Sequence, residues 1–408
     1  MVELDMDFVR KQFPAFDEPG LRDQAHFENA GGSFVCRYAI WRLHRFYRSR
    51  KLQPHGAHQK CLEACGEMDE ARARLSRILG VAADELHFGP STSANSYVLA
   101  QAFRAILPRG AAIIVTNQDH EANTGPWRRL ADNGIEIREW RMDPDSGHLN
   151  LDDLAALLDE KVRLVCFPHC SNVVGEINPV ARICAMSRRV GAATCVDGVA
   201  YAPHGLPDVA ELGADIYLFS TYKTWGPHQG VMVVRRALAE QLPNQGHFFH
   251  ESDPTRRLTP AGPDHAQVAA CAGVADYIDA LYKRHHVGGR DGRARARVVH
   301  DMMRQREIRL MGPLIDYLKD RNDTRLLGPV KPAERAPTIS VVHRQPGTEL
   351  ARALSTHGII AGGGTFYADR ALEGMGIAPE RGVLRLSFLH YTTEDEVDRL
   401  IEALDSVL

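Results

Sequence analysis

The chain has 408 residues, 44% hydrophobic and 25% charged, which is typical of a globular protein with one large domain and a smaller one. Its formal net charge of −3 gives no electrostatic reason to expect nucleic acid or an anionic membrane as a partner, because either usually requires a basic excess. We therefore expect a small-molecule ligand.

The first residues, MVELDMDFVRKQFPAF, are partly acidic and lack the basic start and apolar core of a signal peptide. No stretch reaches the roughly 18 apolar residues of a membrane span. The eight cysteines are scattered without the CxxC spacing of a zinc ribbon, so we expect reduced thiols and no metal site. Together these features predict a cytoplasmic protein.

Helical patterns alternate with short apolar runs through the first two thirds of the chain. Residues 62–79 have apolar positions at three-to-four spacing and predict a core-facing helix. The runs AAIIVTNQDHEAN, RLVCFPHCSN, AATCVDGVAYAPHG and ADIYLFSTYK predict strands that end in polar clusters. This alternation is typical of βα units on a parallel sheet, whose functional residues collect where the strands end.

The last third is predicted to form a separate α+β lobe. VGGRDGRARAR, residues 287–297, suits an exposed turn that enters a helix, and we place a domain boundary there. PTISVVHR and GVLRLSFLHY predict strands, and TEDEVDRLIEALDSVL predicts a closing helix capped by a threonine. The glycines at 362–364 lack the GxGxxG spacing of a dinucleotide site, and we interpret them as a flexible hinge.

Lys223 follows the buried-strand pattern DIYLFS and precedes the turn WGPHQG, which leads into a second buried strand, VMVV. An amine at such a point is partly desolvated, which lowers its pKa and makes it a usable nucleophile or base. Asp197 ends the preceding strand, and neighbouring strands lie about 4.8 Å apart. The pair can therefore hold opposite sides of one aromatic ring, as pyridoxal phosphate requires. A structural lysine and a helix-capping aspartate are the alternatives.

Three further groups suit the same ligand. His120 follows another apolar strand and can lay its imidazole on the ring, or it is a hydrogen-bonded filler. Ser91, Thr92 and Ser93 open a helical pattern, where hydroxyls and free amides make either a phosphate site or an ordinary cap. Arg385 lies on an otherwise apolar strand and requires a carboxylate partner, either the substrate's or an internal acid.

With these motifs in this order, the sequence resembles the class V aminotransferase-fold enzymes, which are fold type I pyridoxal-phosphate enzymes, and within them the cysteine desulfurase-like group. The resemblance runs from HFENAGG, residues 26–32, to the last helix. It implies an α/β fold with a large domain, 26–285, that contains a mostly parallel seven-stranded sheet. It also implies a smaller α+β domain, 286–408, an N-terminal segment, 1–25, packed on that small domain, and a homodimer with active sites at the interface.

The resemblance also implies the site. In such enzymes pyridoxal 5'-phosphate forms a Schiff base with the residue at Lys223, and Lys223, His120 and Asp197 are the implied catalytic residues. The implied cofactor-binding residues are Ser91, Thr92, Ser93, His120, Asn172, Asp197, Ser220, Tyr222 and Lys223. The implied substrate-binding residues are Arg385, Asn29, His55, His58 and Tyr367, with His55 and His58 as surface histidines in the alternative interpretation.

Several positions depart from the family pattern. The persulfide-forming cysteine of desulfurases aligns with Tyr367, and no cysteine follows Cys271. Ala200 stands where a Gln or His usually contacts the ring hydroxyl, and Tyr222 stands where a His often precedes the lysine. The segment AGPDH, 261–265, lacks the threonine that carries a phosphate contact from the partner subunit.

We therefore expect an enzyme that acts on a small α-amino acid. Because the similar enzymes are desulfurase-like and the acceptor cysteine is absent, the favoured reaction is C–S cleavage by β-elimination. A class V aminotransferase is the first alternative. A kynureninase-like hydrolase and a catalytically silent dimeric binding protein are further alternatives.

Overall fold

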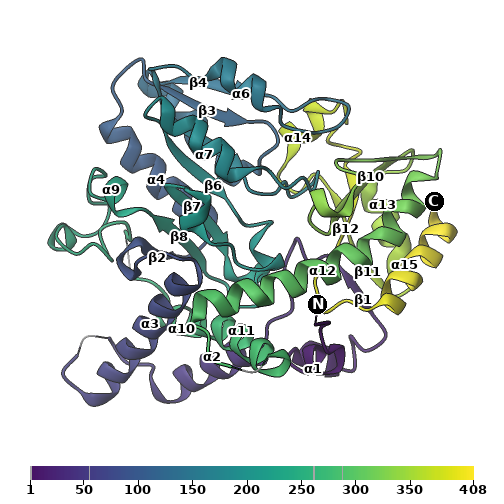
Figure 1. Cartoon of the computed structure of the whole chain (residues 1–408), viewed down its shortest axis with the longest axis horizontal. Coiled ribbons are helices and arrows are strands. Elements are labelled where there is room, and N and C mark those ends of the chain that lie inside the picture. The colour runs from purple at the N-terminus through teal and green to yellow at the C-terminus, as the bar shows by residue number, and fades with distance from the viewer. Residues whose placement is uncertain (1, 55, 261, 287) are drawn as a thin grey trace.

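The computed structural model describes residues 2–54, 56–260, 262–286 and 288–408. The chain forms two lobes, each built around one β-sheet (Figure 1). The larger sheet has seven strands in the order β2-β8-β7-β6-β5-β3-β4, and the smaller has five in the order β1-β11-β12-β10-β9. The predicted α/β class, with a large sheet and a smaller C-terminal lobe, is confirmed.

The strands of the large sheet are β2 (Leu86–Gly89), β3 (Ala112–Thr116), β4 (Glu136–Trp140), β5 (Val162–Pro168), β6 (Ala193–Asp197), β7 (Ile216–Ser220) and β8 (Gly230–Val234). Those of the small sheet are β1 (Ala25–Phe27), β9 (Thr324–Leu326), β10 (Thr338–His343), β11 (Ile359–Gly364) and β12 (Val383–Ser387). The helices are α1 (Met6–Arg10), α2 (Arg37–Ser49), α3 (Gln59–Ile78), α4 (Thr92–Ile106), α5 (Glu121–Arg128), α6 (Leu151–Leu157), α7 (Val180–Arg189), α8 (Val209–Leu212), α9 (Arg236–Ala239), α10 (His265–Ala270), α11 (Ala272–His285), α12 (Gly292–Lys319), α13 (Gly347–Ser355), α14 (Asp369–Gly374) and α15 (Glu394–Val407).

The large sheet is mostly parallel, as predicted. β3 runs parallel to β4 and β5, β5 runs parallel to β6, and β6 runs parallel to β7. Only β8 opposes its neighbours, β2 and β7. Because parallel strands end at the same edge of a sheet, the residues that follow β3, β5, β6 and β7 are brought to one place.

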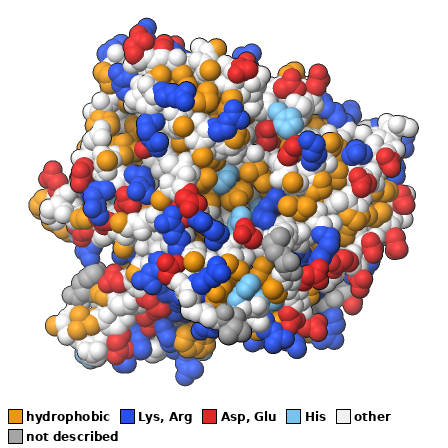
Figure 2. Space-filling view, viewed as in Figure 1, with side chains coloured by type: hydrophobic (Ala, Val, Ile, Leu, Met, Phe, Trp, Pro, Cys, Tyr) orange, Lys and Arg blue, Asp and Glu red, His pale blue; other side chains and the backbone are white. Residues whose placement is uncertain are grey.

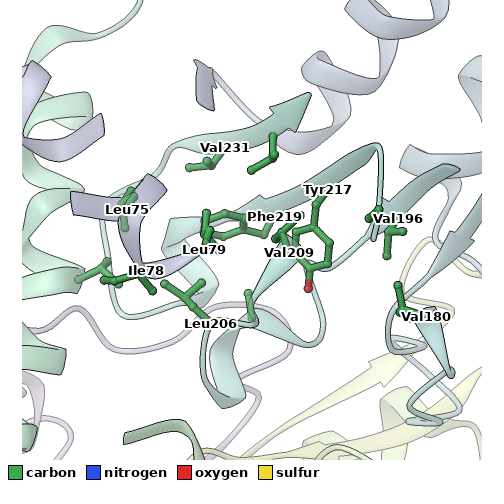
Figure 3. Packing of buried hydrophobic residues seen from close by; sticks show 14 of the residues in the cluster. Leu75, Ile78, Leu79, Val180, Val196, Leu206, Val209, Tyr217, Phe219 and Val231 are labelled. Carbon is green, nitrogen blue, oxygen red and sulfur yellow. The ribbon is translucent and has the colours of Figure 1, made fainter. Parts of the chain in front are cut away.

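Helices cover both faces of this sheet, which explains its nearly continuous apolar strands. Along β7, Tyr217 and Phe219 join the core that α3 and α7 complete, where Leu79 packs beside them (Figure 3). The intervening Leu218 joins the opposite core, which includes Leu99 of α4. This alternation follows from the two-residue period of a strand and fixes which side chains remain at its end.

The small lobe begins earlier in the chain than the sequence predicts. β1 pairs in parallel with β11, so the expected boundary between residues 25 and 26 falls inside a strand of the small sheet. The preceding segment contacts both lobes: Arg10 forms a 3.0 Å ion pair with Glu396 of α15, and Asp5 pairs with Arg284 of α11. The N-terminal residues therefore bridge the two lobes.

The long helix α12 also joins the lobes (Figure 1). It starts from an Asp291 cap, packs on α3 and α11, and ends beside α15. At its middle, Glu307 is fully buried and lies 3.0 Å from His204 Nδ1 of the large lobe. Arg304 pairs with Glu307 and donates to the carbonyl of Arg335 in the small lobe. One buried polar cluster on α12 thus ties the lobes together.

The interpretation of Gly362–Gly364 as a hinge is wrong. These glycines form the end of β11, where Gly362 pairs with Arg385 and Gly363 with Leu384 of β12. A Cβ atom on Gly363 would lie 2.2 Å from the carbonyl oxygen of Gly347, at the start of α13. Gly362 and Gly363 are therefore required by close packing in a strand, and Gly364 by its φ of 139°, rather than by a need for flexibility.

Basic and acidic side chains are interspersed over the face in Figure 2, without a single large patch of one sign. Within the described ranges, no helix combines the length and apolar character needed to cross a membrane.

Candidate active site

Lys223 lies directly after β7, in the short 3-10 helix Thr221–Lys223. The turn is fixed by Thr221, whose N–H donates to the carbonyl of Gln229, and by Trp225, which adopts a left-handed φ of 57°. Strained backbone of this kind persists only where surrounding contacts impose it. Burial and the positive charge of Arg385, opposed by the negative charge of Asp197, lower the pKa of Lys223 to about 8, which makes the amine more easily deprotonated.

Asp197 ends β6, next to β7, and is buried. Its carboxylate accepts a 2.8 Å hydrogen bond from the N–H of Val199. Burial raises the pKa of Asp197 to about 6, so the group is still mainly ionised at neutral pH. The glycine that follows has a steric role, because a Cβ on Gly198 would lie 2.2 Å from the Tyr217 ring.

His120 follows β3 and caps α5, where its Nδ1 accepts a 3.0 Å hydrogen bond from the N–H of Ala122. Burial, with the nearby charges of Lys223 and Arg385, lowers its pKa to about 4. The imidazole is therefore neutral at physiological pH, and its ring can lie against another ring without carrying a charge into the site.

The start of α4 gathers hydroxyl groups at the same edge. Ser91 caps the helix by accepting from the N–H of Ala94 at 3.1 Å, and Thr92 Oγ1 lies 2.7 Å from Ser220 Oγ at the end of β7. This approach requires Gly230, because a Cβ there would lie 2.4 Å from the Ser91 carbonyl carbon. Hydroxyls and unpaired amides at a helix start form a favourable anion site.

One cavity joins all of these groups. All nine residues predicted to bind the cofactor line it: Ser91, Thr92, Ser93, His120, Asn172, Asp197, Ser220, Tyr222 and Lys223. Asn172 donates through Nδ2 to the carbonyl of Phe366 at 2.9 Å, and its buried Oδ1 has no partner within the described part of the chain. One cavity is therefore surrounded by an anion site, an acid, an amine, a flat neutral ring and an unpaired amide oxygen.

Arg385 reaches the edge of the site from β12 and is buried at 2% exposure. Its NH2 group contacts Glu28 Oε1 at 2.7 Å, and its NH1 group donates to the carbonyl of Asn172 at 3.2 Å. The guanidinium carbon lies 3.6 Å from the centre of the Phe366 ring. The sequence left open whether the partner of Arg385 is a substrate carboxylate or an internal acid, and in the structure it is the internal acid Glu28.

Two other residues predicted to bind the substrate, Tyr367 and Asn29, lie at different places around the cavity: Tyr367 at its outer side and Asn29 beside it. Tyr367 is 74% exposed, and its ring lies 5.4 Å from that of His120, at the outer side of the site. Asn29 lines a small neighbouring cavity with Lys223, but its amide donates to the carbonyls of His26 and Ser387. Its carbonyl oxygen accepts from Tyr391, so all its polar atoms are occupied by the fold.

His58 is not among the residues that line the cavity. His58 is exposed and caps α3 by accepting from the N–H of Lys60 at 3.1 Å, which is a structural role. His55 lies outside the described residues.

Four residues of the site were missed by sequence reasoning. Asp119 and His228 line the cavity, and His228 stacks on Tyr222 with ring centres 4.7 Å apart. Glu28 and Phe366 hold Arg385. Glu28, Asp119 and Phe366 directly precede the predicted residues Asn29, His120 and Tyr367, so adjacency to a predicted site residue was the available signal for these three.

The aminotransferase class-V family model matches residues 25–280 and 295–400. The chain therefore belongs to the aminotransferase class-V family, whose members are pyridoxal-phosphate-dependent enzymes of the aminotransferase and cysteine desulfurase type.

Curated relatives match along nearly the full chain. An aminotransferase-like protein of Gibberella zeae is 32% identical, with 98% of both chains covered. A cysteine desulfurase of Pectobacterium carotovorum is 28% identical over 98% of this chain and 97% of the relative. The apo structure of a cysteine desulfurase from Thermococcus onnurineus has a TM-score of 0.85 at 22% identity, covering 100% of this chain and 98% of that one, which establishes the shared fold.

Proposed function

We propose that this protein binds pyridoxal 5'-phosphate through Lys223 and cleaves a C–S bond of a cysteine-derived α-amino acid by β-elimination. The observation that carries the proposal is the buried amine of Lys223, which lies with ionised Asp197 in one cavity next to the hydroxyls of α4. Family membership supports the cofactor, because the family is one of pyridoxal-phosphate-dependent enzymes.

The residues of the cavity fit the chemical groups of this cofactor. Ser91, Thr92 and Ser93 with Ser220 would hold the phosphate, and Asp197 would hold the pyridine nitrogen in its charged form. His120 would lie against the ring, and the unpaired Asn172 Oδ1 is available to the ring hydroxyl. When bound, pyridoxal phosphate supplies an electron sink that stabilises negative charge at the α-carbon of an amino acid.

The protein's own groups would position the substrate and move its proton. Arg385 would bind the amino acid's carboxylate, as the arginine of a carboxylate site does. Lys223, whose pKa is lowered to about 8, would then take the α-proton on Nζ. Elimination from cysteine releases sulfide, and water completes the conversion to pyruvate and ammonia.

The environment of the cysteines supports elimination over sulfur transfer to the protein. Tyr367 stands in the loop ahead of Arg385, and no cysteine follows Cys271. Cys170 lines the cavity, but burial raises its pKa to about 12, and its thiol donates to the carbonyl of Gly175. A thiol held in this way is a poor acceptor, because the thiolate is the nucleophilic form.

Transamination is the second candidate, supported by the aminotransferase-like relative. Incubating the yellow holoenzyme with amino acids and cysteine conjugates distinguishes the two reactions. Pyruvate and sulfide from sulfur substrates support elimination, whereas new keto acids and the amine form of the cofactor support transamination.

Lys223→Ala tests the site itself. We expect this variant to lose catalysis and covalent, borohydride-stable attachment of the cofactor, because no other amine lines the cavity among the described residues. Lys319→Ala, which removes an exposed lysine at the end of α12, is the matched control and should retain both. Retained attachment in Lys223→Ala would refute the proposal.

We further propose that the protein is a homodimer. The segment His247–His250 exposes Phe248 and Phe249, at 87% and 63%, beside a cavity of about 660 Å³ that His250 and Arg72 help to line. Exposed aromatic side chains next to a large cavity are typical of an interface. A second copy of this chain is the occupant that the family resemblance implies.

A further inference from the structure

Arg385, the proposed carboxylate anchor, already pairs with a carboxylate of the protein. Glu28 Oε1 lies 2.7 Å from its NH2 group, and this ion pair is buried on the arginine side. A charge pair at this distance leaves little net positive charge to attract a second anion. The state of Glu28 must therefore affect how strongly Arg385 binds a substrate.

The fold has a specific opening for this contact. β11 lies between β1, which ends just before Glu28, and β12, which carries Arg385. Gly362 of β11 is paired with Arg385, and a Cβ atom on Gly362 would lie 2.3 Å from Glu28 Oε2. The backbone of Glu28 bridges to Ser387 at the end of β12, and only glycine at position 362 leaves room for the Glu28 carboxylate beside the guanidinium group.

Glu28 is held less firmly than the arginine. Its contact with Arg385 is through one oxygen, and the buried Oε2 has no hydrogen-bond partner in the part of the chain that the structure describes. Arg385, in contrast, is oriented independently by the Phe366 ring and by the carbonyl of Asn172. Removal of the Glu28 contact therefore leaves the guanidinium group in place.

We propose that Glu28 is the resting counter-ion of Arg385 and competes with the α-carboxylate of the incoming amino acid. This inference rests on the proposed function, which assigns Arg385 as the carboxylate anchor. Binding of an amino acid requires Glu28 to give up part of its contact, which weakens the affinity for every ligand that uses Arg385. Ligands without a carboxylate do not compete, so Glu28 determines affinity for the carboxylate specifically.

Glu28→Gln tests this by removing the charge at almost unchanged size. The probes are L-alanine and L-alaninamide, which differ in the carboxylate, and their dissociation constants are measured on the holoenzyme by titration calorimetry. We expect Glu28→Gln to bind L-alanine about tenfold more tightly, which corresponds to about 1.4 kcal/mol. Its affinity for L-alaninamide should stay within about twofold of the wild type.

Two further variants complete the test. Glu28→Asp keeps the charge but shortens the side chain, so it should tighten L-alanine binding less than Glu28→Gln does. If Glu28→Gln does not fold, Glu28→Asp still tests the inference. Glu380→Gln changes an exposed glutamate and should leave both constants unchanged. Unchanged or weaker binding of L-alanine by Glu28→Gln would overturn the inference, since a residue that only orients Arg385 gives weaker binding.

The two proposals fail in different ways. A wild-type protein that forms no visible cofactor band and no borohydride-stable adduct refutes the proposed function. If the protein forms the band, and Arg385→Gln weakens L-alanine binding while Glu28→Gln does not change it, only the role of Glu28 is refuted. The proposed function then stands.

Discussion

The pKa of Lys223 is subject to opposing influences within the cavity. Burial and the charge of Arg385 lower its pKa, whereas Asp197 raises it, and the net value is about 8. At neutral pH roughly a tenth of the amine is unprotonated, far more than for an exposed lysine. Because only the unprotonated amine reacts with an aldehyde, this fraction limits cofactor attachment.

Attachment of pyridoxal phosphate to the apoprotein should therefore accelerate as the pH rises. We expect the rate to increase about tenfold per pH unit below about 8 and to level off above it, because deprotonation of Lys223 is then complete. Stopped-flow absorbance measures the rate. Arg385→Gln removes a charge that lowers the pKa of Lys223 and should move the midpoint upward.

Arg344→Gln, which changes an exposed arginine, serves as the control and should leave this midpoint in place. A rate that continued to rise tenfold per pH unit from pH 8 to pH 10 in the wild type would contradict the depressed pKa of Lys223.

The site residues that could be predicted from sequence are those with a local signature. Lys223 and Asp197 each follow a strand that is apolar on both sides, so their position at the strand ends was available from the pattern alone. The roles of Glu28 and Phe366 as partners of Arg385 could not be found in this way, although both adjoin predicted residues. Their contact with Arg385 depends on the neighbouring positions of β1, β11 and β12, which no local pattern encodes.

At the scale of elements, β11 shows how a glycine run is misinterpreted. The run Gly362–Gly364 was interpreted as flexible, but Gly362 leaves room for the Glu28 side chain and Gly363 leaves room for the backbone at the start of α13. In contrast, α3 and α15 were predictable because their apolar spacing and caps are local properties, and Thr393 does form the expected cap. Steric requirements between elements cannot be seen in one sequence.

Two glycine substitutions should have opposite effects on stability. Gly363→Ala places a methyl group against the Gly347 carbonyl and should lower the free energy of unfolding by about 1–3 kcal/mol. Gly66 lies on the exposed side of α3, and no atom lies within 4 Å of an added Cβ there. Gly66→Ala should therefore raise the free energy of unfolding by about 0.5–1 kcal/mol. Urea unfolding measures both, and a neutral Gly363→Ala would contradict the packing of β11.

At the scale of the whole molecule, the exposed aromatics Phe248 and Phe249 make assembly testable. Phe248→Asp combined with Phe249→Asp should convert the proposed dimer into monomers, because two charges would have to be buried at the interface. Light scattering after size-exclusion chromatography gives the mass. Ile106→Asp, at another exposed apolar position at the end of α4, should stay dimeric.

The pairing of β1 with β11 has a consequence for synthesis. Ala25 is synthesised more than 300 residues before its partner Ile359. Strand pairing between such distant segments pays a large loop-closure cost and is slow. The large lobe can fold while translation continues, but Glu28 meets Arg385 only after the strand that carries Arg385 has been synthesised. We therefore expect a nascent chain to form the proposed cofactor cavity before it positions Arg385 as the proposed carboxylate anchor.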